Sequence, residues 1–213
     1  AVQGAMVSKY RNAGQTCVCS NRLIIQAGIY DEFVAKFTEA VKDLKVGNGA
    51  EEGVVVGPLI DDKAANGVLD FIDDAVAKGA TIVTGGGRSV LGGSFIDPTI
   101  LINVTRNMRV FSEEIFGPVA PLFKFETEAE VIEMANDTEF GLAAYFYSRD
   151  IGRVYRVSEQ LEYGIIGVNE GIISNEMAPF GGMKESGAGR EGSKYGMDDY
   201  MDLKYVCVGG IDK

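Results

Sequence analysis

Residues 10–25 read Tyr-Arg-Asn-Ala-Gly-Gln-Thr-Cys-Val-Cys-Ser-Asn-Arg-Leu-Ile-Ile, a polar stretch with two cysteines that runs into an apolar one. The apolar end predicts a short buried strand over about Asn21–Ala27. Cys17 lies among small and polar residues, with Arg11 before it and Arg22 after it. A thiolate nucleophile needs exposure together with nearby donors or positive charge. This position therefore suits a reactive cysteine, although polar loops also hold unreactive ones.

The number of cysteines and the lack of histidine limit the kinds of site that this chain can form by itself. The chain has three cysteines and no histidine. Three cysteines make no disulfide framework, which is typical of a reducing compartment, so we expect a cytoplasmic protein. A closed zinc site takes four Cys or His ligands, so the pair Cys17 and Cys19 is not a metal site, and we expect no metal. No Cys-His or Ser-His-Asp arrangement is possible within this chain. A carboxylate base, backbone donors or another segment must therefore activate Cys17.

Composition excludes several classes of partner. The 213 residues, 46% hydrophobic and 24% charged, are ordinary for a folded chain with a sizeable core. A net charge of -11 argues against nucleic acid, which needs a basic surface, and no basic stretch suits an anionic membrane. No apolar run approaches the roughly 20 residues that span a bilayer. The chain opens on Ala1 with neither a signal peptide pattern nor an initiator Met, so we expect it to be internal to a longer one.

Helical and strand patterns alternate along the chain. The expected helices run from an N-cap at Asp31 to just before Gly47, over Asp62–Lys78, from a capping box at Thr127 to Asn136, and over Ile151–Gln160. The expected strands, besides the first, are Thr81–Thr84, Val119–Phe125, Ala143–Ser148 and Ile165–Val168. Pro98 interrupts Phe95–Leu101, which we therefore expect to be an edge or ligand-facing strand at most. Strands alternating with helices indicate an α/β domain with a largely parallel sheet.

The C-terminal part has a different composition. From Gly181 onward glycine and charge dominate, which predicts loop and short helix up to residue 200. The apolar run Leu203–Val208 predicts a final strand that leaves the domain to pair elsewhere, and its Cys207 is typical of a buried structural cysteine. Gly187–Gly192 matches the dinucleotide pattern G-x-G-x-x-G, but that fingerprint needs a strand before it and a helix after it. The residues ahead form no strand, so we reject a cofactor role for this segment.

Three segments, in order, carry a resemblance to a known family. Tyr10–Cys17 resembles the nucleophile motif of the aldehyde dehydrogenase superfamily, Glu114–Pro118 its E-x-F-G-P motif and Pro179–Gly187 its P-F-G-G-x-K-x-S-G motif. The finer match is to the succinate-semialdehyde dehydrogenases, and it rests on Tyr10–Asn12, Cys17–Cys19, Gly171–Asn175 and Gly189–Gly196. The resemblance implies an aldehyde dehydrogenase catalytic domain over residues 1–185 and a C-terminal segment, 186–213, with an oligomerisation strand.

The resemblance implies a catalytic centre at Cys17. Cys17 would attack the aldehyde to give a thiohemiacetal and then a thioester, with its own backbone N–H as one donor to the oxyanion. Glu114 would contact the ribose of the nicotinamide cofactor, and Phe116 would pack near the nicotinamide. By spacing alone, Glu114 is a solvated acid before a strand. Cys19 is a possible redox partner of Cys17, because two exposed cysteines this close would form a strained, labile disulfide; the alternative is that Cys19 only packs.

The resemblance also implies a substrate with a negative charge. Arg11, helped by Ser174, would bind the carboxylate of succinate semialdehyde, and Phe180 would line the substrate tunnel. A guanidinium fork matches a carboxylate in geometry and charge, although by residue type alone Arg11 is equally a surface cation. The implied reaction is NAD- or NADP-dependent oxidation of succinate semialdehyde to succinate, a step of 4-aminobutyrate catabolism.

The chain also departs from the family pattern. In the family the general-base glutamate, the oxyanion asparagine and the cofactor-binding domain all precede the cysteine motif, whereas sixteen residues precede Cys17 here. We therefore expect a fragment that lacks the N-terminal cofactor-binding domain and is inactive alone, and a homo-oligomer, dimer or tetramer, when full length. The alternatives are another aldehyde dehydrogenase, a CoA-acylating relative, or a non-catalytic assembly fragment.

Overall fold

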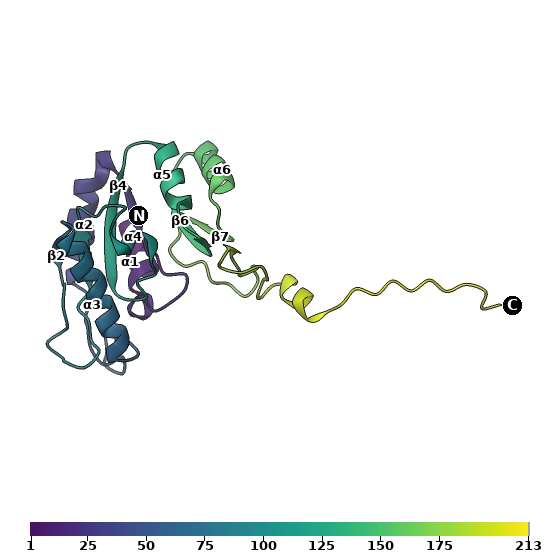
Figure 1. Cartoon of the computed structure of the whole chain (residues 1–213), viewed down its shortest axis with the longest axis horizontal. Helices are drawn as coiled ribbons and strands as arrows, with labels where there is room; N and C mark the ends of the chain where they lie inside the picture. The colour runs from purple at the N-terminus through teal and green to yellow at the C-terminus, as the bar shows by residue number, and fades with distance from the viewer. Residues whose placement is uncertain (213) are drawn as a thin grey trace.

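The computed structural model describes residues 1–212 as a folded body from which the C-terminal segment extends as a long arm (Figure 1). Its helices are α1 (Val2–Tyr10), α2 (Tyr30–Lys42), α3 (Asp62–Ala77), α4 (Arg109–Ser112), α5 (Glu128–Asn136) and α6 (Ile151–Gln160), with 3-10 turns η1 (Arg11–Gly14), η2 (Ala27–Ile29) and η3 (Tyr195–Tyr200). Its strands are β1 (Leu23–Gln26), β2 (Thr81–Thr84), β3 (Thr99–Ile102), β4 (Val119–Phe125), β5 (Phe140–Gly141), β6 (Ala143–Phe146), β7 (Ile165–Val168) and β8 (Met183–Lys184). No helix within residues 1–212 is both long and apolar enough to cross a membrane.

The main sheet has the strand order β1-β4-β3-β2. Strands β1 and β3 run parallel to β4, and β2 runs antiparallel to β3. A second, two-stranded sheet pairs β6 and β7 in parallel. The prediction of an α/β domain with a largely parallel sheet is confirmed.

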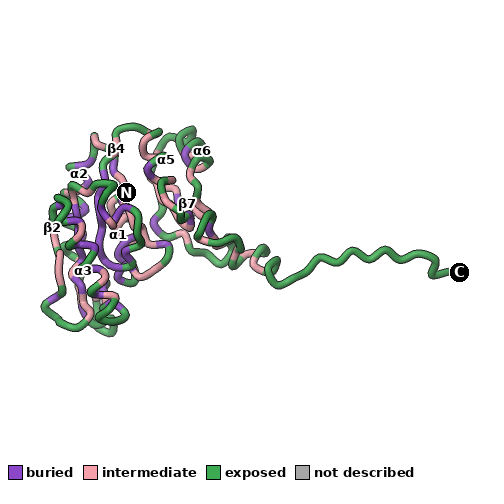
Figure 2. The backbone as a smooth tube through the Cα atoms, in the orientation of Figure 1, coloured by how far each residue is buried: buried purple, intermediate pink, exposed green. Residues whose placement is uncertain are grey.

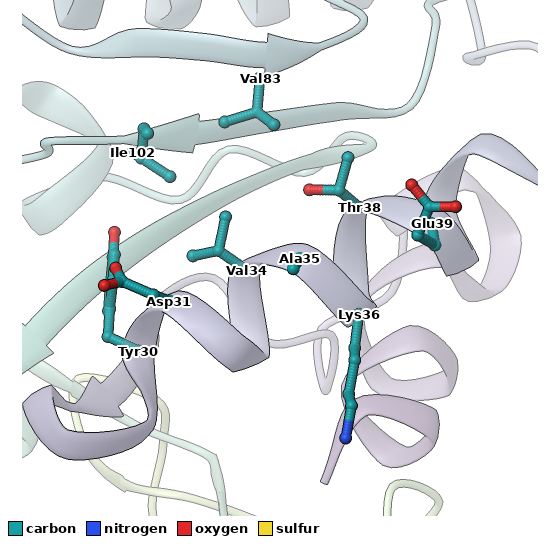
Figure 3. Close-up of a pocket in the computed structure, with 9 residues that line it drawn as sticks. All are labelled: Tyr30, Asp31, Val34, Ala35, Lys36, Thr38, Glu39, Val83 and Ile102. Atoms are coloured by element: carbon teal, nitrogen blue, oxygen red, sulfur yellow. The ribbon is translucent and has the colours of Figure 1, made fainter.

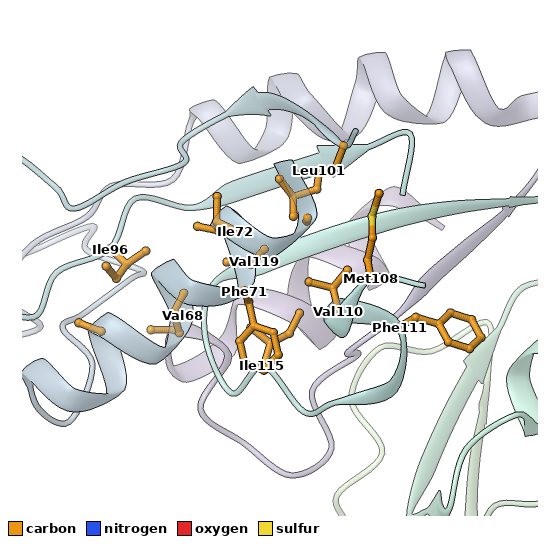
Figure 4. Packing of buried hydrophobic residues seen from close by; sticks show 14 of the residues in the cluster. Val68, Phe71, Ile72, Ile96, Leu101, Met108, Val110, Phe111, Ile115 and Val119 are labelled. Atoms are coloured by element: carbon orange, nitrogen blue, oxygen red, sulfur yellow. The ribbon is translucent and has the colours of Figure 1, made fainter. Parts of the chain in front are cut away.

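The core lies on both faces of the main sheet. Successive residues of a strand point to opposite faces. On one face Ile100 and Leu122 belong to the same buried cluster as Phe37 of α2. On the other face Leu101 and Val119 pack with the apolar side of α3 (Figure 4). The two helices thus cover the two faces of the sheet and fix the strand ends from which the candidate site is built.

The expectation of an edge strand around Pro98 is wrong. Strand β3 starts at Thr99, directly after the proline, and lies between β2 and β4 in the interior of the sheet. Its first N–H, from Thr99, donates to the Pro118 carbonyl at 2.8 Å. Because Pro98 precedes the ladder, its missing N–H removes no hydrogen bond from the sheet.

Local signals place the starts of the expected helices well, but neither α1 nor the four-residue α4 was expected. The capping box of Thr127 and Glu130 is present at the start of α5. Helix α2 starts at Tyr30, one residue before the expected cap at Asp31, which lies in the first turn. Helix α1 was not expected, because its sequence has no apolar stripe and its buried residues include Ser8 and Lys9.

The C-terminal arm leaves the body, as expected, but forms no strand within the residues that the structure describes. Leu203–Val208 is unpaired, and its side chains are exposed (Figure 2). Cys207 is exposed too, so the expectation that it is buried is wrong for this chain by itself. An apolar run is buried only when another surface covers it, and no part of residues 1–212 covers the arm.

Candidate active site

The chain approaches the candidate nucleophile through a left-handed turn. Asn12, Ala13 and Gly14 have φ of 51°, 56° and 77°. For residues other than glycine this conformation costs on the order of 1–3 kcal/mol, and such positions cluster at functional sites. Gly14 also packs against backbone, since a Cβ added there would lie 2.2 Å from the Gly117 carbonyl oxygen. Only glycine fits at this point, and its close contact fixes where the next residues emerge.

Cys17 is exposed on the loop that follows, residues 15–21, which we call the cysteine loop. The Cys19 N–H donates to the Thr16 carbonyl at 2.9 Å and closes a turn around Cys17. Within residues 1–212, the backbone N–H of Cys17 donates to no protein acceptor. The thiol and a free backbone donor therefore belong to the same exposed residue, the arrangement that an attacked carbonyl needs. Cys19 is partly buried, and its thiol donates to the Arg11 carbonyl at 3.6 Å.

The cysteine loop is tied to two distant segments. The Gln15 side chain donates to the Pro58 carbonyl at 3.3 Å and accepts from the Ile60 N–H at 2.9 Å. The Tyr145 hydroxyl, on β6, donates to the Val18 carbonyl at 2.7 Å. These bonds join residues 43 to 127 positions apart, and they hold the loop on either side of Cys17. A nucleophile on a loop needs such support to keep its geometry.

Asn21 ties the end of the loop to the segment that contains Glu114. Its side chain donates to the Glu113 carbonyl at 2.8 Å and accepts from the Ile115 N–H at 2.9 Å. Glu114 is exposed between them, and displacement of water raises the pKa of its carboxyl while attraction to Lys9 opposes the rise. Phe116 follows with φ of 51° and is also exposed. The structure thus links the predicted cofactor contacts, Glu114 and Phe116, to the cysteine loop.

Lys9 is a buried cation beneath the site, and the sequence analysis did not identify it. Its side chain is 1% exposed, and burial lowers its pKa from the ordinary 10.5 to about 8. Attraction to Cys19 and to Glu114 works in the opposite direction. A buried lysine is rare unless it has a partner. Its charge thus attracts one residue of the cysteine loop and the carboxylate of Glu114, and no pattern in the sequence marks it.

Arg11 begins the 3-10 turn η1, and its carbonyl accepts a hydrogen bond from the Cys19 thiol of the cysteine loop. Burial raises the pKa of the Tyr145 hydroxyl, the Arg11 guanidinium lowers it, and Cys19 and Cys17 add to the rise. The hydroxyl of Tyr145 contacts the loop directly through its bond to the Val18 carbonyl, next to Cys17 in the chain. The sequence analysis missed Tyr145, whose role depends on a contact between β6 and the cysteine loop.

Arg22 does not belong to the site, contrary to its place in the polar surroundings of Cys17. Its guanidinium donates to the carbonyls of Met134 and Ala135, both at 2.8 Å, and to the Tyr163 hydroxyl at 3.2 Å. It also stacks 5.0 Å from the centre of the Phe111 ring. Arg22 thus fixes the end of α5, because carbonyls at a helix end attract a cation.

Ser174 and Phe180 lie beyond β7. Ser174 is exposed on the loop that starts at Gly171, and a Cβ added to Gly171 would lie 2.5 Å from the Gly4 carbonyl oxygen. This close contact seats the loop on α1, the helix that leads to Arg11. Phe180 is partly buried and exchanges backbone hydrogen bonds of 2.9 and 2.7 Å with Glu191. No hydrogen bond within residues 1–212 joins Ser174 or Phe180 to Arg11 or Cys17.

Other features of the described residues offer no second centre. Gly187–Gly192 lies between the two-residue strand β8 and the turn η3, so the expectation that no strand precedes this segment is wrong, although no α-helix follows it within residues 1–212. No cluster of metal-ligating side chains occurs within residues 1–212. A shallow hollow lies between Val34 and Thr38 of α2 and the strand residues Val83 and Ile102, and none of the candidate residues lines it (Figure 3).

Comparison with known proteins gives a consistent result. Residues 1–206 match the family profile described as "Aldehyde dehydrogenase family". The chain is 61% identical over 213 residues to a 3-sulfolactaldehyde dehydrogenase of Pseudomonas putida and 62% identical over 211 residues to a glutarate-semialdehyde dehydrogenase of Pseudomonas aeruginosa, covering 44% of each. It is 61% identical over 209 residues to the succinate-semialdehyde dehydrogenase (NADP+) of Escherichia coli K12, covering 98% of this chain and 43% of that one.

Solved structures agree with this comparison. The crystal structure of succinate-semialdehyde dehydrogenase from Burkholderia pseudomallei superimposes with a TM-score of 0.96 at 59% identity, over 97% of this chain and 43% of that one. The chain spans less than half the length of these relatives.

Proposed function

Because the chain belongs to the aldehyde dehydrogenase family, we propose that the complete protein that contains it oxidises succinate semialdehyde to succinate with NAD or NADP. The observation that carries the proposal is the exposed Cys17, whose thiol and unpaired backbone N–H belong to a loop tied down by Gln15 and Tyr145. This arrangement supplies a nucleophile and an oxyanion donor at one residue, and the Cys19 thiol of the same loop is bonded to the Arg11 carbonyl.

The chemistry follows from these groups. The Cys17 thiolate adds to the aldehyde carbon, and the Cys17 N–H stabilises the negative charge that develops on oxygen. A bound nicotinamide cofactor would supply the two-electron oxidation of this adduct by taking up hydride, which would leave a thioester on Cys17. Water hydrolyses the thioester, which releases the carboxylate and returns the thiol. The activating base is expected outside this chain, which has no histidine.

The residues on the cofactor side fit a nicotinamide nucleoside. Glu114 offers an exposed carboxylate for the two ribose hydroxyls, and Asn21 fixes the backbone on both sides of it. Phe116 offers an exposed ring next to that carboxylate. The phosphates and the adenine are expected to bind mainly to an N-terminal domain outside residues 1–213. Both NAD and NADP suit the contacts proposed here.

Arg11 selects for an aldehyde with an anionic tail. The three relatives quoted above are named for sulfolactaldehyde, glutarate semialdehyde and succinate semialdehyde, each of which carries a sulfonate or carboxylate away from the aldehyde. Ser174 and Phe180 complete the proposed substrate contacts from the loop seated on α1. Glutarate semialdehyde, which is one methylene longer, is the second candidate substrate because the identity to that relative is equally high.

Steady-state oxidation of succinate semialdehyde by the complete protein, with NAD and NADP in separate assays, tests the proposal. Cys17→Ala is expected to abolish turnover, and Cys207→Ala, which changes an exposed cysteine on the arm, is the matched control. Limiting iodoacetamide should label Cys17 before the other two cysteines. Full activity of Cys17→Ala would show that Cys17 is not the nucleophile.

The 213-residue chain alone is expected to fold and to be inactive. It should fold because its two-sided sheet buries a continuous core. It should neither bind cofactor nor oxidise aldehyde, because nothing in residues 1–212 forms a strand-supported dinucleotide site. Calorimetric titration with NAD and NADP is the direct measurement, and micromolar binding would contradict the expectation.

We also propose that the complete protein is a homo-oligomer, dimer or tetramer, assembled through the C-terminal arm. The arm is extended, apolar and uncovered within residues 1–212. Light scattering on the complete protein and on a variant truncated after Tyr200 measures the oligomeric state. The truncated variant should form the smaller oligomer or a monomer.

A further inference from the structure

The Asn21 side chain forms hydrogen bonds with the backbone on both sides of Glu114. It donates to the Glu113 carbonyl at 2.8 Å and accepts from the Ile115 N–H at 2.9 Å. Because the two partners are backbone groups two residues apart, this pair of bonds fixes both the position and the orientation of the peptide between them. Asn21 lies four residues after Cys17, so the amide joins the cysteine loop directly to the segment of Glu114.

Both sides of this link are also held by other contacts. The cysteine loop is also held by the Gln15 and Tyr145 bonds. The segment of Glu114 has, on its polar side, a bond from the Glu113 N–H to the Arg109 carbonyl at 2.9 Å and an exposed ion pair between the same two residues. This ion pair is bidentate, since the Arg109 guanidinium donates to both Glu113 carboxylate oxygens at 2.8 and 2.9 Å, and the Ile115 side chain is buried in the core. The Asn21 amide is the side-chain link from this segment to the cysteine loop, so its loss should loosen the backbone around Glu114 relative to Cys17.

We propose that Asn21 is a positioning residue that fixes the Glu114 carboxylate relative to the Cys17 thiol. The inference rests on the proposed function, because it assigns Glu114 to the ribose of the nicotinamide cofactor. Asn21 touches neither substrate nor cofactor in this assignment. It acts through the backbone of Glu113 and Ile115, so that the ribose contact and the nucleophile keep one geometry.

The chain contains a matched control for this role. Asn136 donates to the Gln160 carbonyl at 2.8 Å and accepts from the Glu162 N–H at 2.9 Å, again two residues apart. It joins the end of α5 to the end of α6, and neither of its bonds involves a residue of the cysteine loop. Asn21→Ala and Asn136→Ala therefore remove the same pair of bonds from two places, and both should lower the melting temperature by similar amounts.

Kinetics of the complete protein separate positioning from stability. Asn21→Ala is expected to raise the KM for the cofactor about tenfold, the effect of losing two hydrogen bonds that hold a binding group, with less than about a twofold change in kcat at saturating cofactor. Asn136→Ala should leave both constants unchanged. Equal cofactor KM values in the two variants, in an enzyme that oxidises the aldehyde, would overturn the inference and leave the proposed function intact.

Hydrogen exchange on the 213-residue chain gives a readout that needs no activity. Asn21→Ala should speed amide exchange at residues 113–117, and Asn136→Ala should speed it at 160–162 only. Unchanged exchange at 113–117 would show that the amide does not hold Glu114, whatever the enzyme does. If the complete wild-type protein oxidised no aldehyde with NAD or NADP, the proposed function would fail and the cofactor part of the inference would fail with it.

Discussion

Replacing Lys9 by methionine is expected to stabilise the 213-residue chain by about 3 kcal/mol at pH 7, because it removes a buried charge from a site of similar volume. Lys9 is 1% exposed, and burial lowers its pKa from 10.5 to about 8. At about 1.36 kcal/mol per unit of pKa, the gap between these values corresponds to about 3 kcal/mol. Burial disfavours the charged form of Lys9. The loss of stability that this causes is therefore fully present at a pH below the pKa of Lys9 in the folded protein.

The loss of stability caused by burying the Lys9 charge should decline as the pH rises. Between pH 8 and 10.5 the folded Lys9 is mostly neutral while the unfolded side chain still holds its proton, so stability rises with pH over this window. The advantage of Lys9→Met should therefore fall to about half of its value by pH 9.5. Urea unfolding of the wild-type chain and of Lys9→Met at pH 7 and pH 9.5 measures this advantage. Other titrating groups contribute equally to both proteins, so their contribution drops out of the difference in unfolding free energy.

Lys36→Met is the control, since Lys36 forms an exposed ion pair with Glu32. Its effect should stay within about 0.5 kcal/mol and should not vary with pH in this window. If Lys9→Met gave no stabilisation at pH 7, or one that was independent of pH, the charge of Lys9 would not be penalised by its burial. In the complete enzyme the same substitution should reduce activity, because the cation acts on Glu114 and Cys19.

Arg11→Ala should lower kcat/KM for succinate semialdehyde by about 10- to 150-fold through loss of a charge-assisted pair, and should change an uncharged aldehyde of equal length far less; equal losses would make Arg11 structural. Mild peroxide should join Cys17 to Cys19 and inactivate the enzyme until a thiol reductant is added; peptide mapping that finds only a sulfinic acid on Cys17 would exclude this switch. Gly14→Ala should destabilise the chain by at least about 2 kcal/mol in urea unfolding, because φ is 77° and the new Cβ would lie 2.2 Å from the Gly117 carbonyl oxygen; a near-neutral result would mean that this turn relaxes freely.

The elements with local signals could be predicted from the sequence. Helix α3 has an apolar stripe, and the start of α5 has its capping box, so both follow from spacing and cap chemistry alone. Pro98 misled the prediction for β3, because one residue decides whether a proline lies inside a ladder or before it. Helix α1 was missed, because its buried residues include the polar Ser8 and Lys9 beside Tyr10.

Some residues of the candidate site could likewise be predicted from the sequence, and others could not. Cys17 and Arg11 lie within one short motif and could be identified from it. Asn21 and Tyr145 could not, because their partners lie 92 and 127 residues away, and only the folded chain brings them together. Lys9 could not either, because its environment, and not its place in the sequence, makes it unusual.

The arm that follows Tyr200 has a consequence for symmetry. Both edges of its backbone are unpaired within residues 1–212, so it can add as a strand to a sheet edge of another molecule. If two copies exchange arms reciprocally, the contact is two-fold and closes. If each copy instead gives its arm to a second copy and receives one from a third, the contact does not close, and the chains grow as a fibre. Asp202 and Lys204, which flank Leu203 with opposite charges, favour one register of pairing over its neighbours. The geometry of the exit near Tyr200 thus decides between a closed assembly and an open one.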